Sequence, residues 1–197
     1  MDVSEDKKYA ILERQKYVLG DYSLVTIQPD DIEDIREWRN AQLDVLRQST
    51  PISSEQQIEY FSKIIWPSMD LPQPKNILFT FFKNGQRIGY GGLVHISWSD
   101  KRAELSFLLD PKYGHRDDDY AKHFLAYIHL ILGVAFGDLK FHRVFAETYS
   151  FRKTHISILE KADFKFEGAM RDHVLVNGTF FDSLLHGILN NEGNSKE

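Results

Sequence analysis

The chain has 197 residues and a formal net charge of −5, with 42% hydrophobic and 27% charged residues. This length favours one domain, and the composition is that of a globular protein rather than a disordered or fibrous one. Because acidic and basic residues are interspersed, we expect no generic nucleic-acid binding. The sequence contains no cysteine, which excludes disulfides, thiolate chemistry and zinc sites that use sulfur.

The first residues are polar, and no apolar run approaches the roughly 18 residues of a membrane span. We therefore expect a cytoplasmic protein with no membrane contact. Residues 1–21 are expected to form an N-terminal extension, residues 22–189 a single domain, and residues 190–197 a flexible polar tail.

The first half of the chain predicts a strand, two helices and a meander. The strand covers 22–28, and Pro29-Asp30-Asp31 then starts a helix that ends near Asn40. Ser53-Ser54-Glu55-Gln56 starts a second helix, which ends before Pro67. From Asn76 the hydrophobic period becomes that of strands, and turns at Asn84-Gly85 and Ser99-Asp100 join three antiparallel strands at 77–82, 87–96 and 103–109.

The second half predicts a helix over 119–136, a strand at 143–149, a helix over 152–161 and a hairpin around Asn177-Gly178. This order lacks the strict alternation of a doubly wound sheet, so we expect the α+β class. Gly89-Tyr90-Gly91-Gly92 lies inside the meander and is not a dinucleotide fingerprint. The eight histidines lack metal-ligand spacing, so no metal site is expected.

Eight short sequence segments occur in an order that, taken together, is specific for one protein family. They are Arg36-Glu-Trp-Arg-Asn40, Arg87-Ile-Gly-Tyr-Gly-Gly92, Ala103-Glu-Leu-Ser-Phe-Leu-Leu-Asp-Pro111, Phe141-His-Arg-Val144, Ile156-Ser-Ile-Leu-Glu-Lys-Ala-Asp-Phe164, Phe166-Glu-Gly168, Arg171-Asp172 and Val176-Asn-Gly178. With them the chain resembles the GNAT superfamily of N-acetyltransferases over residues 22–189. Within it, the resemblance is to the branch that acts on ribosomal-protein N-termini and amino sugars.

The resemblance implies a single-domain acyl-CoA N-acyltransferase fold, with a mixed twisted sheet, helices on both faces and splayed central parallel strands. Strands 103–109 and 143–149 would part, and the pantetheine arm of acetyl-CoA would bind their free backbone groups. Amides near Leu108 and Leu109 would stabilise the oxyanion. The loop and first turn of the next helix would bind the pyrophosphate.

The sequence departs from the family at that loop. The closest match is Arg116-Asp117-Asp118-Asp119-Tyr120-Ala121, in which Asp119 replaces the central glycine. Two like charges about 4 Å apart repel by roughly 1 kcal/mol in water, so aspartates that faced phosphate would weaken binding. Alternatively, the three aspartates face solvent and cap the helix.

Two further cofactor-binding candidates come from the next helix, where Arg152 and His155 replace the usual Asn and Ser. Glu104 is the first candidate general base, although it could instead pair with a surface cation. The tyrosine that relatives use as general acid is replaced by Glu160. Tyr149 is therefore a candidate acid, with His155 as the other possibility.

The acceptor is expected to contact Trp38, Arg39 and Asn40, although Trp38 could equally belong to the core. The predicted hairpin places His173 opposite Asp182, either to bind a substrate amine or as a structural pair.

We therefore expect an N-acetyltransferase that moves an acetyl group directly from acetyl-CoA to a primary amine, without a metal. The acceptor would be a peptide N-terminus, an amino sugar or a small amine, and the chain could form a homodimer. The alternative is a catalytically degenerate module of the same fold with impaired CoA binding, which the acidic loop favours.

Overall fold

The computed structural model describes residues 6–114 and 116–192. The strands are β1 (Lys16–Leu19), β2 (Tyr22–Thr26), β3 (Ile77–Lys83), β4 (Gln86–Ser97), β5 (Arg102–Leu109), β6 (Arg143–Tyr149), β7 (Lys165–Val176) and β8 (Thr179–Leu189). The helices are α1 (Ile32–Asn40), α2 (Ser54–Tyr60), α3 (Trp66–Ser68), α4 (Asp117–Leu132) and α5 (Lys153–Lys161). Short 3-10 helices cover Pro29–Asp31, Leu43–Val45 and Pro111–Tyr113, and π-helical turns cover Phe61–Ile65 and Gly133–Asp138.

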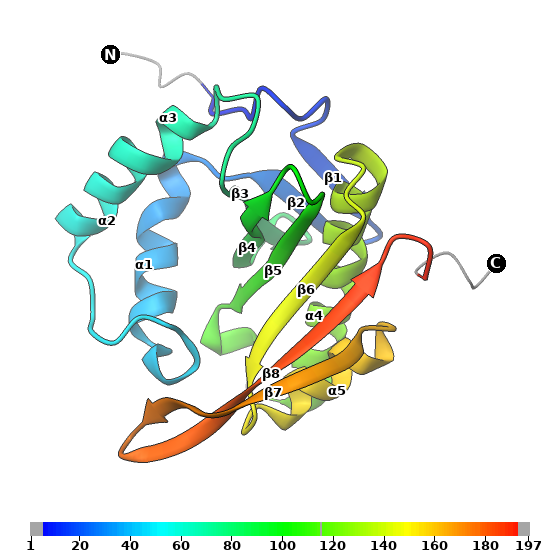
Figure 1. Ribbon diagram of the computed structural model, residues 1–197. Helices are drawn as coiled ribbons and strands as arrows, with labels where there is room; N and C mark the ends of the chain where they lie inside the picture. Colours follow the sequence, from blue (N-terminus) through cyan, green and yellow to red (C-terminus); the bar gives the residue numbers. More distant parts are fainter. Residues whose placement is uncertain (1–5, 115, 193–197) are drawn as a thin grey trace.

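Within the described residues the strands form one eight-stranded sheet in the order β1-β2-β3-β4-β5-β6-β8-β7. Every neighbouring pair in it is antiparallel except β5 and β6. Helices α1 to α3 lie on one side of the sheet, and α4 and α5 lie on the other (Figure 1). The expected mixed α+β fold is therefore confirmed.

Local sequence signals account for several element boundaries. Asn84-Gly85 and Asn177-Gly178 have positive φ at both positions, as a two-residue hairpin turn requires. Ser53 and Gln56 form the reciprocal hydrogen bonds of a capping box at the start of α2. Helix α4 begins two residues earlier than the sequence predicted, so all three aspartates lie in its first turn.

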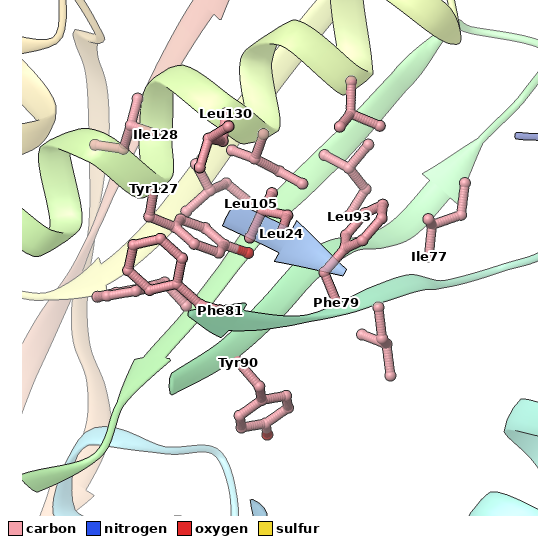
Figure 2. Close-up of a cluster of buried hydrophobic side chains, with 14 of the residues drawn as sticks. Leu24, Ile77, Phe79, Phe81, Tyr90, Leu93, Leu105, Tyr127, Ile128 and Leu130 are labelled. Atoms are coloured by element: carbon pink, nitrogen blue, oxygen red, sulfur yellow. The ribbon is translucent and has the colours of Figure 1, made fainter. Parts of the chain in front are cut away.

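The core occupies both faces of the sheet, against α4 on one side and against α1 and the α2 region on the other. Figure 2 shows Tyr127 of α4 beside Phe81 and Leu105, whereas Tyr90 extends from the opposite face of the sheet. The Tyr127 hydroxyl donates to the Ser106 carbonyl at 2.7 Å. A Cβ at Gly91 would lie 2.4 Å from that hydroxyl, so this glycine of β4 is needed for close packing.

Helix α4 and its π-helical continuation, Asp117–Asp138, are long and apolar enough to cross a membrane by length and composition. Half of the most apolar window of this segment is nevertheless buried inside the protein. Phe124, Ile128 and Ile131 are fully buried in the core, which accounts for the high hydropathy of the helix.

The segment before residue 22, expected to be an extension, supplies part of the domain. Strand β1 pairs with β2 along its whole length. Tyr9 is fully buried, and its hydroxyl accepts a hydrogen bond from the Leu78 amide at 3.0 Å. Of the predicted tail 190–197, residues 193–197 lie outside the described part of the chain.

Replacing Tyr9 with Phe tests whether this segment stabilises the domain. The change leaves the buried Leu78 amide without its acceptor, so we expect the free energy of unfolding to fall by about 1–3 kcal/mol in urea denaturation. Tyr113→Phe is the control, because the Tyr113 hydroxyl bonds Gln86 at the surface, and it should change stability by less than about 0.5 kcal/mol. Equal effects of the two variants would contradict a structural role for the segment.

Candidate functional site

Strands β5 and β6 are paired only at their beginnings. The parallel ladder joins Arg102 with Arg143, Ala103 with Val144, and Glu104 with Phe145. Beyond this point the described residues form no ladder between 105–109 and 146–149, although β5 still pairs with β4 and β6 still pairs with β8. The expected splay is therefore present, and two strand edges face each other with unpaired backbone groups.

Hydrogen bonds at the other end keep the two strands together. The Lys101 carbonyl accepts from the amides of His142 and Arg143, at 2.7 and 3.2 Å. Beside the point of separation, β4 contains a bulge between Val94 and Ser97, and such bulges increase the local twist. The strands therefore diverge from a fixed hinge at Glu104.

A cavity of about 570 Å³ occupies the region where the strands separate. Its wall includes both free edges, through residues 104–107 of β5 and Ala146, Glu147 and Tyr149 of β6. Helices α1 and α2 and the loop between them close the opposite side, and Arg152 and His155 of α5 border it. The side chains therefore leave the gap between the strands open.

Glu104 lies at the hinge and contacts two basic side chains. Its carboxylate accepts from Arg47 Nη2 at 2.9 Å and contacts His95 Nδ1 at 2.7 Å, while its side chain is only 10% exposed. His95 lies in the β4 bulge with φ 47°, a strained value for a residue other than glycine. The sequence analysis gave pairing with a surface cation as the alternative for Glu104, and the structure shows such a pair with Arg47, which lies in a loop.

A second carboxylate completes this cluster. Arg47 Nη2 also binds Glu147 at 2.7 Å, and His173 Nε2 lies 3.8 Å from the same carboxylate. The predicted pairing of His173 with Asp182 is wrong, because the β7–β8 register shifts between Met170 and Val174. Asp182 instead accepts a hydrogen bond from the Asp172 amide. The bulge turns His173 toward β6 and the cavity side of the sheet.

Tyr149, the candidate general acid, ends β6 and lines the cavity. Burial raises the pKa of its hydroxyl above the ordinary value, although the nearby charge of Arg47 opposes the shift. Tyr149 therefore remains protonated at neutral pH and can donate a hydrogen bond.

Arg152 and His155 form a cluster with Tyr120. The Tyr120 hydroxyl lies 2.7 Å from His155 Nδ1 and 3.2 Å from Arg152 Nη2. The His155 ring stacks on Phe124 at 4.1 Å between centroids. Burial, reinforced by the charge of Arg152, holds the pKa of His155 well below its usual value. His155 is therefore a neutral imidazole, and the three predicted residues lie together.

The acidic first turn of α4 lies beside α5. Asp117 accepts from the Thr154 hydroxyl at 3.1 Å, and Asp119 lies 3.9 Å from Arg116 Nε. Arg116, the N-cap residue, makes no side-chain cap hydrogen bond, so the first-turn amides lack that partner. Ala121 is partly buried against the core. The aspartates occupy the helix start, as the capping alternative proposed, but form no cap bond of their own in the residues described.

The backbone amides proposed to stabilise the oxyanion belong to the end of β5, which pairs with β4 on one side and has a free edge on the other. Leu108 and Leu109 pair with Tyr90 and Gly89 of β4, and the Leu109 carbonyl also accepts from Gln42 Nε2 at 2.9 Å. Because successive backbone groups point to opposite sides of a strand, alternate amides between Leu105 and Leu109 point into the gap.

The structure gives the three predicted acceptor residues different roles. Trp38 is buried in the core, as the structural alternative stated. Asn40 holds the loop after α1 through both the amide and the carbonyl of Ile52, at 2.9 and 2.8 Å. Arg39 lines the cavity and donates to the Tyr90 hydroxyl at 2.6 Å.

Sequence reasoning missed Arg47, His95 and Glu147. Arg47 lies in a loop that no pattern marks, and the strained bulge at His95 has no sequence signature. Glu147 could have been noticed, because it is a charged residue within a largely apolar strand. In the described part of the chain, no group of three or more His, Asp or Glu side chains is arranged to hold a metal ion.

The depressed pKa of His155 predicts a pH-dependent contribution to stability. The unfolded imidazole takes up a proton below about pH 6.5 and the folded one does not, so stability is lost as pH falls, by up to about 1.4 kcal/mol per pH unit. We expect His155→Asn to show a shallower loss between pH 6.5 and 5 in urea denaturation. His129→Asn, an exposed change on α4, should keep the wild-type slope, and identical slopes for all three proteins would contradict the assignment.

The family model described as an acetyltransferase (GNAT) domain matches residues 24–185. Two similar solved structures come from Vibrio cholerae. The spermidine N-acetyltransferase in complex with CoA and spermine is 17% identical, with a TM-score of 0.78 and coverage of 89% of this chain and 99% of that one. A dodecameric structure of spermidine N-acetyltransferase is also 17% identical, with a TM-score of 0.74 and coverage of 90% and 98%.

A probable acetyltransferase is 20% identical, with a TM-score of 0.69 and coverage of 89% and 97%. No curated protein matches the sequence. The structural likenesses establish the fold, and the family model spans most of the chain. The chain therefore belongs to the GNAT family of acetyl-CoA-dependent N-acetyltransferases.

Proposed function

We propose that the protein acetylates a primary amine by direct transfer at the cavity between β5 and β6. The observation that carries this proposal is the separation of the two strands after Glu104 and Phe145 into a cavity that also reaches His95 and Tyr149. The free edges suit an extended ligand with amide groups, and the other side chains of the wall supply acid–base chemistry. The acceptor would be a peptide N-terminus, an amino sugar or a small amine.

The residues present fit acetyl-CoA. The two strand edges offer unpaired amides and carbonyls to the pantetheine arm, as an added strand would use them. The first turn of α4 has amides without a side-chain cap for the pyrophosphate, and Arg116 and Arg152 supply positive charge nearby. Asp117, Asp118 and Asp119 oppose that charge, which weakens the phosphate site without removing its amides.

Acetyl-CoA supplies a thioester whose carbonyl carbon is attacked by the amine. Because the chain has no cysteine, the protein offers no thiol for an acyl-enzyme intermediate. Its own residues must instead hold the amine, remove its proton and assist the leaving sulfur.

His95 is the group that accepts the amine proton in this proposal. Its Nδ1 contacts the Glu104 carboxylate, which leaves Nε2 as the available nitrogen. Both Glu104 oxygens already accept hydrogen bonds, one from Arg47 and the other from His95. Glu104 therefore orients the imidazole rather than acting as a free base.

Tyr149 donates a hydrogen bond to the leaving sulfur. It lies at the end of the free edge of β6, in the cavity wall, and its raised pKa keeps the proton on the hydroxyl at neutral pH. Amides of the β5 edge between Leu105 and Leu109 stabilise the developing oxyanion.

The homodimer and the cytoplasmic location stay predictions. Leu175 and Phe180 on the β7–β8 hairpin are each 60% exposed, which leaves apolar surface that a second copy could cover. Size-exclusion chromatography with light scattering would measure the assembly directly.

Replacing His95 with Gln tests the proposed base. General-base catalysis contributes about 10²- to 10⁴-fold, so kcat for a responsive amine should fall within that range while the affinity for acetyl-CoA is unchanged. Added imidazole should restore part of the rate. His129→Gln is the matched control and should act like the wild type. If His95→Gln keeps most of the activity and Glu104→Gln loses it, Glu104 itself is the base.

Asp119→Asn tests the phosphate site. Removing one charge about 4 Å from a phosphate is worth roughly 1 kcal/mol in water, so the affinity for acetyl-CoA should rise about fivefold in calorimetric titration. Asp100→Asn, in the turn before β5, is the control and should leave the affinity unchanged. An unchanged affinity in Asp119→Asn would show that Asp119 points away from the ligand. A wild-type protein that gave no heat with millimolar acetyl-CoA would instead support the degenerate module.

A further inference from the structure

The charges of the cavity wall are unevenly compensated. Arg47 binds two carboxylates, those of Glu104 and Glu147. Arg39, on α1, lines the same cavity, yet no carboxylate in the described residues lies within ion-pair distance of it. Arginine does not lose its proton in proteins, so the wall of the acceptor side carries a permanent positive charge without a counter-ion.

Neutral groups hold the Arg39 guanidinium in one orientation. Its Nε donates to Gln48 Oε1 at 2.8 Å, and its Nη1 donates to the Tyr90 hydroxyl at 2.6 Å. Gln48 is itself fixed by the Asn40 side chain at 3.0 Å, and only 7% of Tyr90 is exposed. The planar group is therefore preorganised, although these two neutral partners leave its charge uncompensated.

A preorganised guanidinium in a cavity wall suits a carboxylate or a phosphate, which it can bind through parallel hydrogen bonds. The same wall is unfavourable for a polycation. Arg39 repels it, and the carboxylates of Glu104 and Glu147 are already occupied by Arg47. The charge arrangement thus differs from what a polyamine requires.

We propose that the acceptor is a primary amine that also carries an anionic group, a carboxylate or a phosphate, and that Arg39 binds this group. The inference rests on the proposed function, because it assigns the far end of the acceptor in the same cavity. It makes Arg39 a specificity-determining residue, while His95 and Tyr149 perform the chemistry at the amine end.

The test compares amines that share a carbon chain and differ in charge. The carboxylate pair is 5-aminopentanoate with pentylamine, the phosphate pair is 3-aminopropyl phosphate with propylamine, and cadaverine serves as the dication. With wild-type protein and acetyl-CoA, free-thiol release gives kcat/KM for each amine. We expect at least a tenfold preference for an anionic amine over its neutral partner, and the pair with the larger ratio identifies the anion. Cadaverine should be the poorest substrate of the five-carbon series.

Variants then assign the preference to Arg39. Arg39→Gln should reduce the ratio of kcat/KM for the anionic amine to kcat/KM for the neutral amine to about one, and Arg39→Lys should retain part of this ratio. Arg14→Gln is the control, because Arg14 is exposed and pairs with Asp138 outside the cavity, and it should keep the wild-type ratio.

The remaining outcomes separate the two proposals. If amines are acetylated without preference for an anion, or if cadaverine is preferred, the present inference is overturned and the proposed function stands. A preference that survives in Arg39→Gln overturns the assignment to Arg39. If the wild-type protein binds acetyl-CoA but acetylates none of the five amines, this inference is overturned, and the proposed function fails as well if a peptide N-terminus and an amino sugar are also left unacetylated.

Discussion

The separation of β5 from β6 after Glu104 and Phe145 is the constraint on which the site depends. In a sheet, a strand edge without a partner leaves backbone amides and carbonyls that must bind something else. Here each strand keeps its other neighbour, β4 or β8, and the Lys101 carbonyl ties their beginnings together. The sheet is therefore continuous where β5 and β6 begin and open where they end. The opening is stable because each strand stays paired with its other neighbour.

The chemical groups gather where the strands part. The bulge in β4 places His95 beside Glu104, and the loop after α1 brings Arg47 over the hinge, where it binds carboxylates from both strands. Arg47 thus links β5, β6 and the acceptor-side loop through charge-assisted hydrogen bonds. On the other side of the sheet, His155 and Tyr120 fill the space between α4 and α5, and burial keeps the imidazole neutral.

Much of the fold could be predicted because its signals are local. The two Asn-Gly turns, the Ser53 capping box and the hydrophobic periods of the strands depend only on neighbouring residues, and the structure shows the corresponding elements. The sequence segments that resemble the GNAT superfamily added the expectation that the central parallel strands separate, and the β5–β6 register confirms it. The exception is long-range: Tyr9 belongs to the domain through its contact with Leu78, which no local pattern reveals, whereas β1 pairs with β2 across the adjacent Gly20-Asp21 turn.

By itself, the sequence determined the α+β class, the strand and helix order, the family resemblance and the residues at the ends of β5 and β6, because periodicity and turn chemistry are written along the chain. Only the tertiary structure decided how charges are shared. Glu104 pairs with Arg47 and His95, Glu147 joins them, and a register shift turns His173 away from Asp182. Arg39 likewise acquires neutral partners, Tyr90 of β4 and Gln48 of the loop that follows α1. Arg47 lies far along the chain from both carboxylates, and Arg39 lies far from Tyr90, and all of these contacts depend on bulges and loop paths that residue spacing does not encode.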